Sequence, residues 1–246
     1  MSKTTKIRLF VDSKLTNGQH VDIKEEQSRY LSSVMRLDVG DKILLFNGKD
    51  GEFVAQLQKV GKKSVEVKVL EQTREFVGAE DIWLMFAPIK KDRTDFVIEK
   101  ATELGVKKII PTITRYTITD KAKKERFEAQ AIEASEQSRR LDVPEIDNAV
   151  KLEDVLQNWD ESRTLFFMDE TGKGRSAIEE FSAHKGKAAL LIGPEGGFAE
   201  EELENLRSKS YAQAVSLGPL ILRAETAVAA ALSIWQATAG SWSKKD

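Results

Sequence analysis

The sequence contains no cysteine, and two of its 246 residues are histidines, His20 and His184. The missing cysteines exclude disulfide bonds, thiolate metal sites and cysteine nucleophiles, and two histidines leave little for a zinc site. No apolar run approaches the roughly 18 residues that a membrane-spanning helix needs. The first residues also lack the apolar segment of a signal peptide. We therefore expect a soluble cytoplasmic protein that needs neither a metal ion nor a membrane.

The formal net charge of −2 argues weakly against nucleic-acid binding, but the charges are unevenly distributed along the chain. Residues 1–72 hold 13 Lys+Arg and 10 Asp+Glu, whereas the remaining residues hold 25 and 30. A mildly basic part therefore precedes a mildly acidic part. So small an excess is also ordinary surface variation, and charge alone identifies no ligand.

The first part of the chain has the pattern of a small β-barrel domain over residues 1–72. Short alternating apolar segments are separated by turn signals such as Asn47-Gly48 and Asp50-Gly51. Between them, apolar residues spaced by three and four predict a helix over 26–37. Residues 73–80 are typical of a linker.

Residues 81–246 alternate strand and helix patterns, which predicts an α/β domain with a mostly parallel sheet covered by helices. The predicted strands lie at 82–87, 109–113, 165–168, 188–192 and 214–217. The predicted helices lie around 96–104 and at 124–140, 199–208 and 224–239. In such sheets, ligands bind beyond the carboxyl ends of the strands.

Two glycine turns occupy that position. The first spans residues 193–197, with three glycines and a proline, and the second is Leu217-Gly218-Pro219, which runs into Arg223-Ala224-Glu225-Thr226. Glycine lets the backbone approach a ligand closely. Neither a Walker loop nor GxGxxG is present, so phosphate binding is disfavoured, and Glu195 suits a hydroxyl, an amino group or a cationic sulfonium better than a polyanion. One such turn commonly only reverses the chain, but two in succession favour a binding site.

Four segments in matching order resemble the ribosomal RNA small-subunit methyltransferase E family of the SPOUT class. Together they extend over nearly the whole chain. The first two segments are residues 30–48 (YLSSVMRLDVGDKILLFNG) and residues 100–106 (KATELGV). The third is Glu136-Gln137-Ser138 with Arg140 and Val143-Pro144-Glu145-Ile146, and the fourth consists of the two turns with their flanks, LIGPEGGF at 191–198 and LG at 217–218 with ILRAETA at 221–227. The chain departs from the family at Leu220, where a basic residue is more usual.

The resemblance implies a PUA-like barrel followed by an α/β domain whose C-terminal segment forms a trefoil knot. It also implies a homodimer that binds S-adenosylmethionine in the knotted turns. The methyl group goes to N3 of one uridine in 16S ribosomal RNA, so the partner is that RNA or the small ribosomal subunit.

The resemblance assigns roles to individual residues. The cofactor-binding residues would be Leu191, Gly193, Glu195, Gly196, Gly197, Leu217, Gly218 and Leu222. Arg223 and Glu225 would be catalytic, with Arg223 holding the nucleotide or stabilising negative charge that develops on the base, and Glu225 assisting loss of the N3 proton. Alternatively, Glu225 is a carboxylate in the first helical turn and Arg223 is its structural partner.

The RNA contacts would come from Arg8, Arg29, Arg36 and Arg140. Arg29 and Arg36 lie seven residues apart in the predicted helix and would share one face, although such a pair is also typical of a solvated flank. Two other functions stay open: methylation of a different RNA atom, and a non-catalytic RNA-binding module for ribosome assembly.

Overall fold

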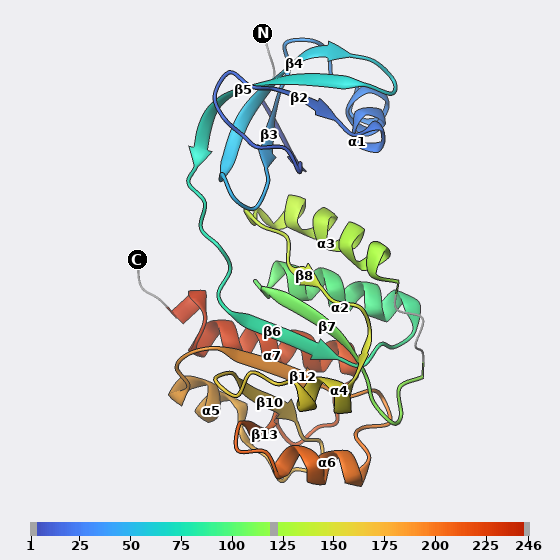
Figure 1. The fold of residues 1–246 in the computed structure, drawn as a ribbon, viewed down its shortest axis with the longest axis vertical. Helices are drawn as coiled ribbons and strands as arrows, with labels where there is room; N and C mark the ends of the chain where they lie inside the picture. Colours follow the sequence, from blue (N-terminus) through green and yellow to red (C-terminus); the bar gives the residue numbers. More distant parts are fainter. Residues whose placement is uncertain (1–3, 119–122, 244–246) are drawn as a thin grey trace. The chain divides into compact units, whose positions relative to one another are not determined.

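The computed structural model describes residues 4–118 and 123–243, and the chain forms two compact units (Figure 1). The first unit extends to Gly78 and also includes Ser135–Val143. The second unit contains Ala79–Ala134 and the chain from Pro144 onwards. Assignment of 1–72 and 81–246 as domains stays a prediction, and the inclusion of Ser135–Val143 in the first unit had no signal in the sequence.

The first unit is built on a five-stranded sheet with the order β1-β3-β4-β5-β2. The strands are β1 (Thr4–Phe10), β2 (His20–Ile23), β3 (Lys42–Phe46), β4 (Glu52–Val60) and β5 (Val65–Arg74). β1 and β3 are parallel, and the other neighbouring pairs are antiparallel. β1 and β2 are the two edge strands, and within the described residues no backbone hydrogen bonds pair them. The sheet of this small β domain is therefore not closed into a barrel by hydrogen bonds between these strands.

The helix predicted at 26–37 is shorter and changes its winding. α1 spans Glu25–Arg29 and continues as a π-helix, η1, over Tyr30–Val34. Arg36 then adopts the left-handed region, with φ 53°. The expectation that Arg29 and Arg36 share one helical face is therefore wrong, because a seven-residue spacing marks one face only in an uninterrupted α-helix.

The second unit has a parallel sheet with the order β11-β13-β10-β12-β6-β7-β8, and β9 pairs with β7. Its main strands are β6 (Ile82–Phe86), β7 (Lys108–Ile113), β10 (Thr164–Met168), β12 (Ala188–Ile192) and β13 (Ala212–Ser216). Two-residue strands complete it: β8 (Glu145–Ile146), β9 (Val150–Lys151) and β11 (Arg175–Ser176). The predicted α/β fold with a parallel sheet is confirmed.

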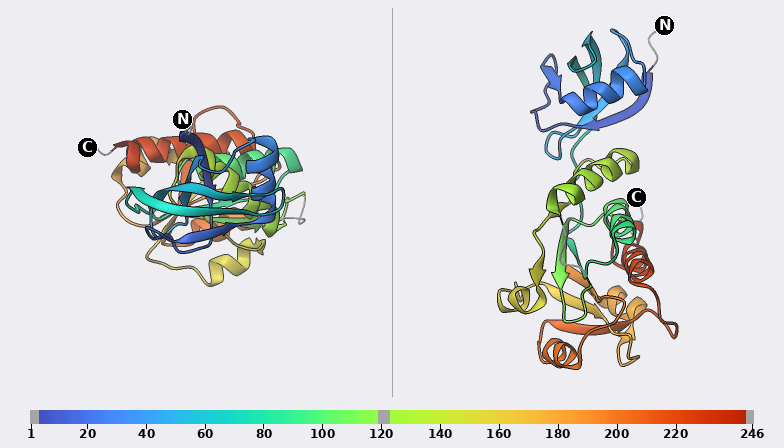
Figure 2. Two further views of the ribbon diagram at one scale, coloured as in Figure 1. Left: turned by 90° about the horizontal axis from the view of Figure 1, so that it is seen from above. Right: turned by 90° about the vertical axis from the view of Figure 1, so that its right-hand side faces the viewer.

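Helices cover both faces of this sheet (Figure 2). They are α2 (Lys91–Glu103), α4 (Leu152–Gln157), α5 (Ala177–Ala183), α6 (Glu200–Arg207) and α7 (Ala224–Thr238), followed by the 3₁₀ turn η2 (Ser241–Ser243). α3 (Lys124–Ser138) begins in this unit, and its last residues belong to the first unit. α4 and α6 share one apolar core with Leu165 and Phe167. Phe166, which alternates with them along β10, contacts rings of α5 and α7 on the other face.

The long helices and the main strands were predicted from sequence, whereas α4, α5 and β2 were not. These elements have four to seven residues, too few to establish a clear period. Gly105 follows the C-cap of α2 and has φ 81°, a backbone conformation that glycine adopts readily at the end of a helix. None of the helices in the described part of the chain is both long and apolar enough to cross a membrane.

Candidate functional site

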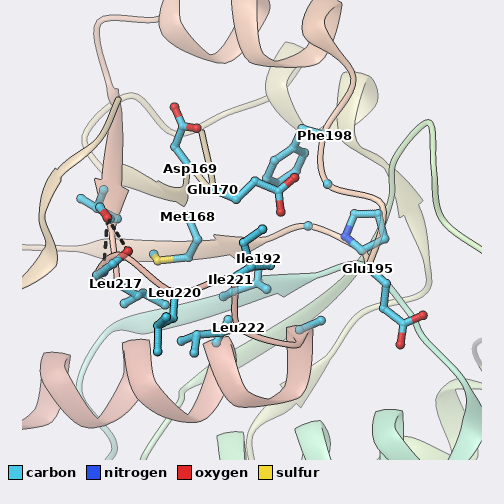
Figure 3. Close-up of a pocket in the computed structure, with 18 of the residues that line it drawn as sticks. Met168, Asp169, Glu170, Ile192, Glu195, Phe198, Leu217, Leu220, Ile221 and Leu222 are labelled. Carbon is cyan, nitrogen blue, oxygen red and sulfur yellow. Dashed lines mark hydrogen bonds between the residues drawn. The ribbon is translucent and has the colours of Figure 1, made fainter. Parts of the chain in front are cut away.

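Both glycine turns line one pocket at the carboxyl edge of the parallel sheet (Figure 3). β10 pairs on one side with β12, which leads into the first turn, and on the other with β13, which leads into the second. The pocket holds about 730 Å³ of empty space, including its open mouth. This size suits a small organic ligand.

Most of the predicted cofactor-binding residues lie in this pocket. The lining includes Gly193, Glu195, Gly197, Leu217, Gly218 and Leu222. It also includes residues that sequence reasoning missed, among them Met168, Asp169, Glu170, Ile192, Phe198 and Ile221. Part of this group had a signal in the sequence: Met168 ends the strand pattern at 165–168, and Asp169 and Glu170 directly follow it, so they belong to the same sheet edge.

Two predicted cofactor contacts lie elsewhere. Leu191 is fully buried in the core shared with Leu203 and Leu206 of α6, while its neighbour Ile192 lines the pocket. Successive side chains of a strand point to opposite faces, so the two residues cannot both face the ligand. Gly196 lies against Tyr116, whose Cβ would be 3.3 Å from a Cβ placed on the glycine. Neither residue lines the pocket, and their assignment to the cofactor stays a prediction.

The backbone of the turns requires glycine at two positions in the pocket lining. Gly197 has φ 70°, and a Cβ there would lie 1.8 Å from Oε1 of Glu170. Gly218 has φ 115°, with its N–H donating to Oγ of Ser216 at 3.3 Å. Both conformations are strained for residues with a side chain. The turns thus expose main-chain groups that a Cβ would otherwise cover.

Asp169 supports the pocket wall from behind. Its side chain is fully buried; Oδ1 accepts hydrogen bonds from N–H and Oγ1 of Thr171, and Oδ2 accepts one from Arg207 at 2.8 Å. Burial by itself raises the pKa of this carboxyl, but the hydrogen bonds from Thr171 and Arg207 outweigh it and the pKa is lowered. Asp169 is therefore ionised and held in place.

An arginine that sequence reasoning missed connects the first turn to the start of α7. Arg93, in the first turn of α2, pairs with Glu195, and its Nε lies 3.6 Å from Oε1 of Glu225. Figure 3 shows the Glu195 side chain directed away from the apolar lining residues. Glu195 thus already has a cationic partner. No local sequence signal marked Arg93, because Glu195 is 102 residues away from it.

Glu225 and Arg223 are close in sequence and differ in environment. The Glu225 side chain is 15% exposed, and its Oε2 is buried without a hydrogen-bond partner among the described residues. Arg223, the N-cap of α7, is exposed, and its side chain makes no hydrogen bond or ion pair with the described residues. The structure therefore does not support Arg223 as the structural partner of Glu225, a place that Arg93 takes.

Arg8 is buried in the first unit. Its guanidinium donates to Oε2 of Glu52 at 2.7 Å and to the carbonyls of Ser135, Glu136 and Arg140 at 2.6–2.9 Å. It also lies over the Phe46 ring, at 4.5 Å from the centroid. These contacts satisfy the carbonyls at the end of α3. They argue against the predicted phosphate contact, because the donors of Arg8 are occupied and covered.

Of the other predicted RNA-binding arginines, Arg140 is covered like Arg8, whereas Arg29 and Arg36 are exposed. Arg140 is 8% exposed and its Nε lies 3.0 Å from Asp142, so a direct contact with RNA does not fit this side chain either. Arg29 is exposed and pairs with Glu25 within α1. Arg36 is exposed, with no hydrogen bond or ion pair in the described residues. Arg29 and Arg36 are thus available to an external ligand.

No metal centre accompanies the pocket in the portion of the chain described. Among residues 4–118 and 123–243, no three His, Asp or Glu side chains are grouped so as to hold an ion. The expectation of a metal-independent protein stays a prediction.

Two sequence-family models match the chain. The model of an RNA methyltransferase PUA domain matches residues 23–70, and that of an RNA methyltransferase domain matches residues 78–236. Curated relatives extend the similarity over most of the chain. Ribosomal RNA small subunit methyltransferase E of Rickettsia conorii is 36% identical, covering 92% of this chain and 93% of the relative. That of Bacillus subtilis is 32% identical, with 86% and 87% covered.

Solved structures of similar proteins agree in fold. Ribosomal RNA small subunit methyltransferase E of Neisseria gonorrhoeae, bound to S-adenosylmethionine, superposes with a TM-score of 0.86 at 31% identity, covering 94% of this chain and 96% of that one. A putative methyltransferase of Legionella pneumophila, also in complex with S-adenosylmethionine, gives 0.83 at 32% identity, covering 96% and 98%.

Proposed function

This chain belongs to the RNA methyltransferase family that includes ribosomal RNA small subunit methyltransferase E, and from that premise we propose that it transfers a methyl group from S-adenosylmethionine to N3 of one uridine in 16S ribosomal RNA. The observation that carries the proposal is the pocket in which both signature turns meet. Similar proteins of known structure hold S-adenosylmethionine. The choice of uridine N3 rests on the family resemblance.

The pocket residues suit this cofactor. Gly197 and Gly218 leave main-chain groups open at the two turns, and Ile192, Leu217 and Leu222 offer apolar contact for an adenine ring. The lining contains carboxylates and no Lys, Arg or His, which suits a ligand that carries a sulfonium. When bound, S-adenosylmethionine supplies an activated methyl group. Because this displacement depends mainly on positioning, we infer no role for a metal.

Arg223 and Glu225 are the residues to which we assign the chemistry. Arg223, exposed beside the pocket at the start of α7, holds the target nucleotide or offsets negative charge that develops on the uracil. Uracil N3 carries a proton that must leave. Glu225 is the carboxylate assigned to that proton, because its Oε2 has no hydrogen-bond partner among the described residues. Arg93 orients Glu225 through its Nε.

The N3 atom lies on the Watson–Crick edge, so the uridine must be unpaired or flipped out before reaction. We assign the phosphate contacts of the surrounding RNA to Arg29 and Arg36, which are exposed. The substrate is 16S ribosomal RNA, free or in the small subunit, which places the protein in the cytoplasm. The first domain, PUA-like, would deliver the RNA and the second would perform the transfer.

We also propose the trefoil knot and the homodimer that the family resemblance implies. Support for the knot comes from the second turn, which shares the pocket with the loop after β10 and with the first turn.

Support for the dimer comes from Leu220 and Ile221, which are 77% and 84% exposed. Sedimentation equilibrium tests the dimer, and a monomer at micromolar concentration would contradict it.

The function is tested by two measurements. Titration calorimetry of the full chain with S-adenosylmethionine should show binding. Absence of both heat and a thermal shift would favour a non-catalytic RNA-binding module.

Mass spectrometry of nucleosides from 16S ribosomal RNA of a deletion strain should show loss of one N3-methyluridine. Restoration by the wild-type gene is the control. Loss of a different methylated nucleoside would identify another RNA atom as the target.

A further inference from the structure

A carboxylate lies between the two glycine turns at a position that no motif of the sequence marked. Glu170 follows β10, the strand that pairs with both β12 and β13. Figure 3 shows its side chain extending into the pocket. Its Oε1 would be 1.8 Å from a Cβ on Gly197, so this carboxylate lies directly against the first turn.

The charges of the lining are not evenly balanced. Three acidic residues are among those that line the pocket, namely Asp169, Glu170 and Glu195. Arg207 pairs with Asp169, and Arg93 pairs with Glu195. Glu170 is exposed and forms no hydrogen bond or ion pair with the described residues, and the lining contains no basic side chain. The uncompensated negative charge of the pocket is therefore located at Glu170.

We propose that Glu170 makes the pocket prefer the positively charged sulfonium S-adenosylmethionine over the neutral thioether S-adenosylhomocysteine that remains after methyl transfer. The two molecules share the adenosine and amino-acid groups and differ by one methyl group and one positive charge at sulfur. This proposal rests on the proposed function. When the C–S bond breaks, its electron pair stays on sulfur, so the attraction to Glu170 ends with the transfer. The residue thereby favours cofactor capture and product release.

A hydrogen bond from Glu170 to a ribose hydroxyl is the competing role for a carboxylate in this position. Both ligands carry the same hydroxyls, so such a bond would strengthen the binding of both to the same extent. A Coulomb interaction with sulfur affects only the charged ligand. The difference between the two affinities therefore separates the two roles.

The experiment is titration calorimetry of the full chain with S-adenosylmethionine and, separately, with S-adenosylhomocysteine. Glu170→Gln keeps the shape of the side chain and removes its charge. Because the carboxylate is exposed, we expect the variant to bind the sulfonium about three- to fivefold more weakly. Binding of the thioether should stay unchanged. Glu179→Gln, which removes an exposed carboxylate of α5 outside the pocket, is the matched control and should preserve the wild-type preference.

Ionic strength gives a readout that needs no variant. Raising the salt concentration should weaken binding of the sulfonium more than binding of the thioether to the wild-type protein, because salt screens an exposed charge. An equal loss for both ligands in Glu170→Gln, or no loss for either, would overturn the proposal while leaving the cofactor pocket in place. Failure of the wild-type chain to bind either ligand would instead overturn the proposed function.

Discussion

Arg223 and Glu225 begin the same helix, yet the fold gives their side chains different surroundings. Arg223 is exposed, and Glu225 is largely covered, with Arg93 beside one carboxylate oxygen. An exposed arginine without an internal partner is available to substrate, whereas a covered carboxylate is held in one orientation. The two residues can therefore be tested separately.

Replacement of Arg223 by alanine should lower the methylation rate by about two orders of magnitude, as does loss of one charge-stabilising donor in other enzymes. The affinity for S-adenosylmethionine should change little, because Arg223 does not line the pocket. Turnover with RNA and calorimetry with the cofactor measure the two effects. Arg175→Ala, at an arginine that is 82% exposed, is the control. Normal turnover of Arg223→Ala would remove this residue from the site.

The ionised side chain of Asp169 should make the stability of the protein depend on pH. Asp169→Asn should lower the free energy of unfolding at neutral pH by about 1–3 kcal/mol, since the charged pair with Arg207 is lost. The pKa of Asp169 is lowered by folding from its ordinary value of 3.8, so its stabilising contribution is present above that value. The contribution declines as the pH falls through the folded pKa.

Urea unfolding of wild type and Asp169→Asn at neutral pH and near pH 3 measures this effect. The difference between the two proteins should shrink in acid. A difference that stays constant over this range would show that the ionised carboxylate is not the source of the stabilisation.

At the scale of elements, the position of β10 organises the pocket. It lies between the strands that lead into the two glycine turns, so the loop after it contributes Asp169 and Glu170 to the same hollow. α2 contributes Arg93, which contacts both the first turn and α7. The cofactor turn and the helix that carries the proposed catalytic residues are thus connected through one side chain.

Arg93 and Glu195 should be energetically coupled. We expect Arg93→Ala and Glu195→Ala each to weaken S-adenosylmethionine binding, and the double variant to lose less than both losses combined. The coupling should amount to about 0.5–1 kcal/mol, because both side chains are one-third exposed. Calorimetry on the four proteins completes the cycle. Arg93→Lys keeps the charge and should recover part of the loss, whereas strict additivity would show that the pair does not orient the turn.

At the scale of the whole molecule, the chain forms a small β unit and an α/β unit, and we propose that the first binds RNA and the second performs the transfer. The net charge of −2 hides a basic first part. The buried Arg8 and the nearly buried Arg140 hold the end of α3 within the first unit. Arg29 and Arg36 of the same unit are exposed, and they are the residues that we propose to contact RNA.

RNA binding should therefore depend on salt and on Arg36. We expect the affinity for a 16S fragment to fall as salt rises, and Arg36→Ala to reduce the slope of log K against log salt by about 1. Fluorescence anisotropy at several salt concentrations measures the slope. Arg175→Ala, on the α/β domain, should leave it unchanged. An affinity indifferent to salt would contradict phosphate contacts altogether.

The sequence by itself determined the α/β fold, the main strands and long helices, and the two glycine turns. These features follow from local causes, namely the period of apolar residues and the positive φ of Gly197 and Gly218. Together with the family resemblance, they also identified S-adenosylmethionine before any contact was known.

The tertiary structure decided which side chains meet. Leu191 packs in the core with α6 whereas Ile192 lines the pocket, and Arg8 is buried against the end of α3. Arg93 pairs with Glu195 across 102 residues of sequence. Such pairings depend on the strand that lies at each edge and the helix that covers each face, because contact between distant segments is set by packing of the whole domain. For the same reason Glu170, which no sequence motif marks, lies in the pocket that the two turns line.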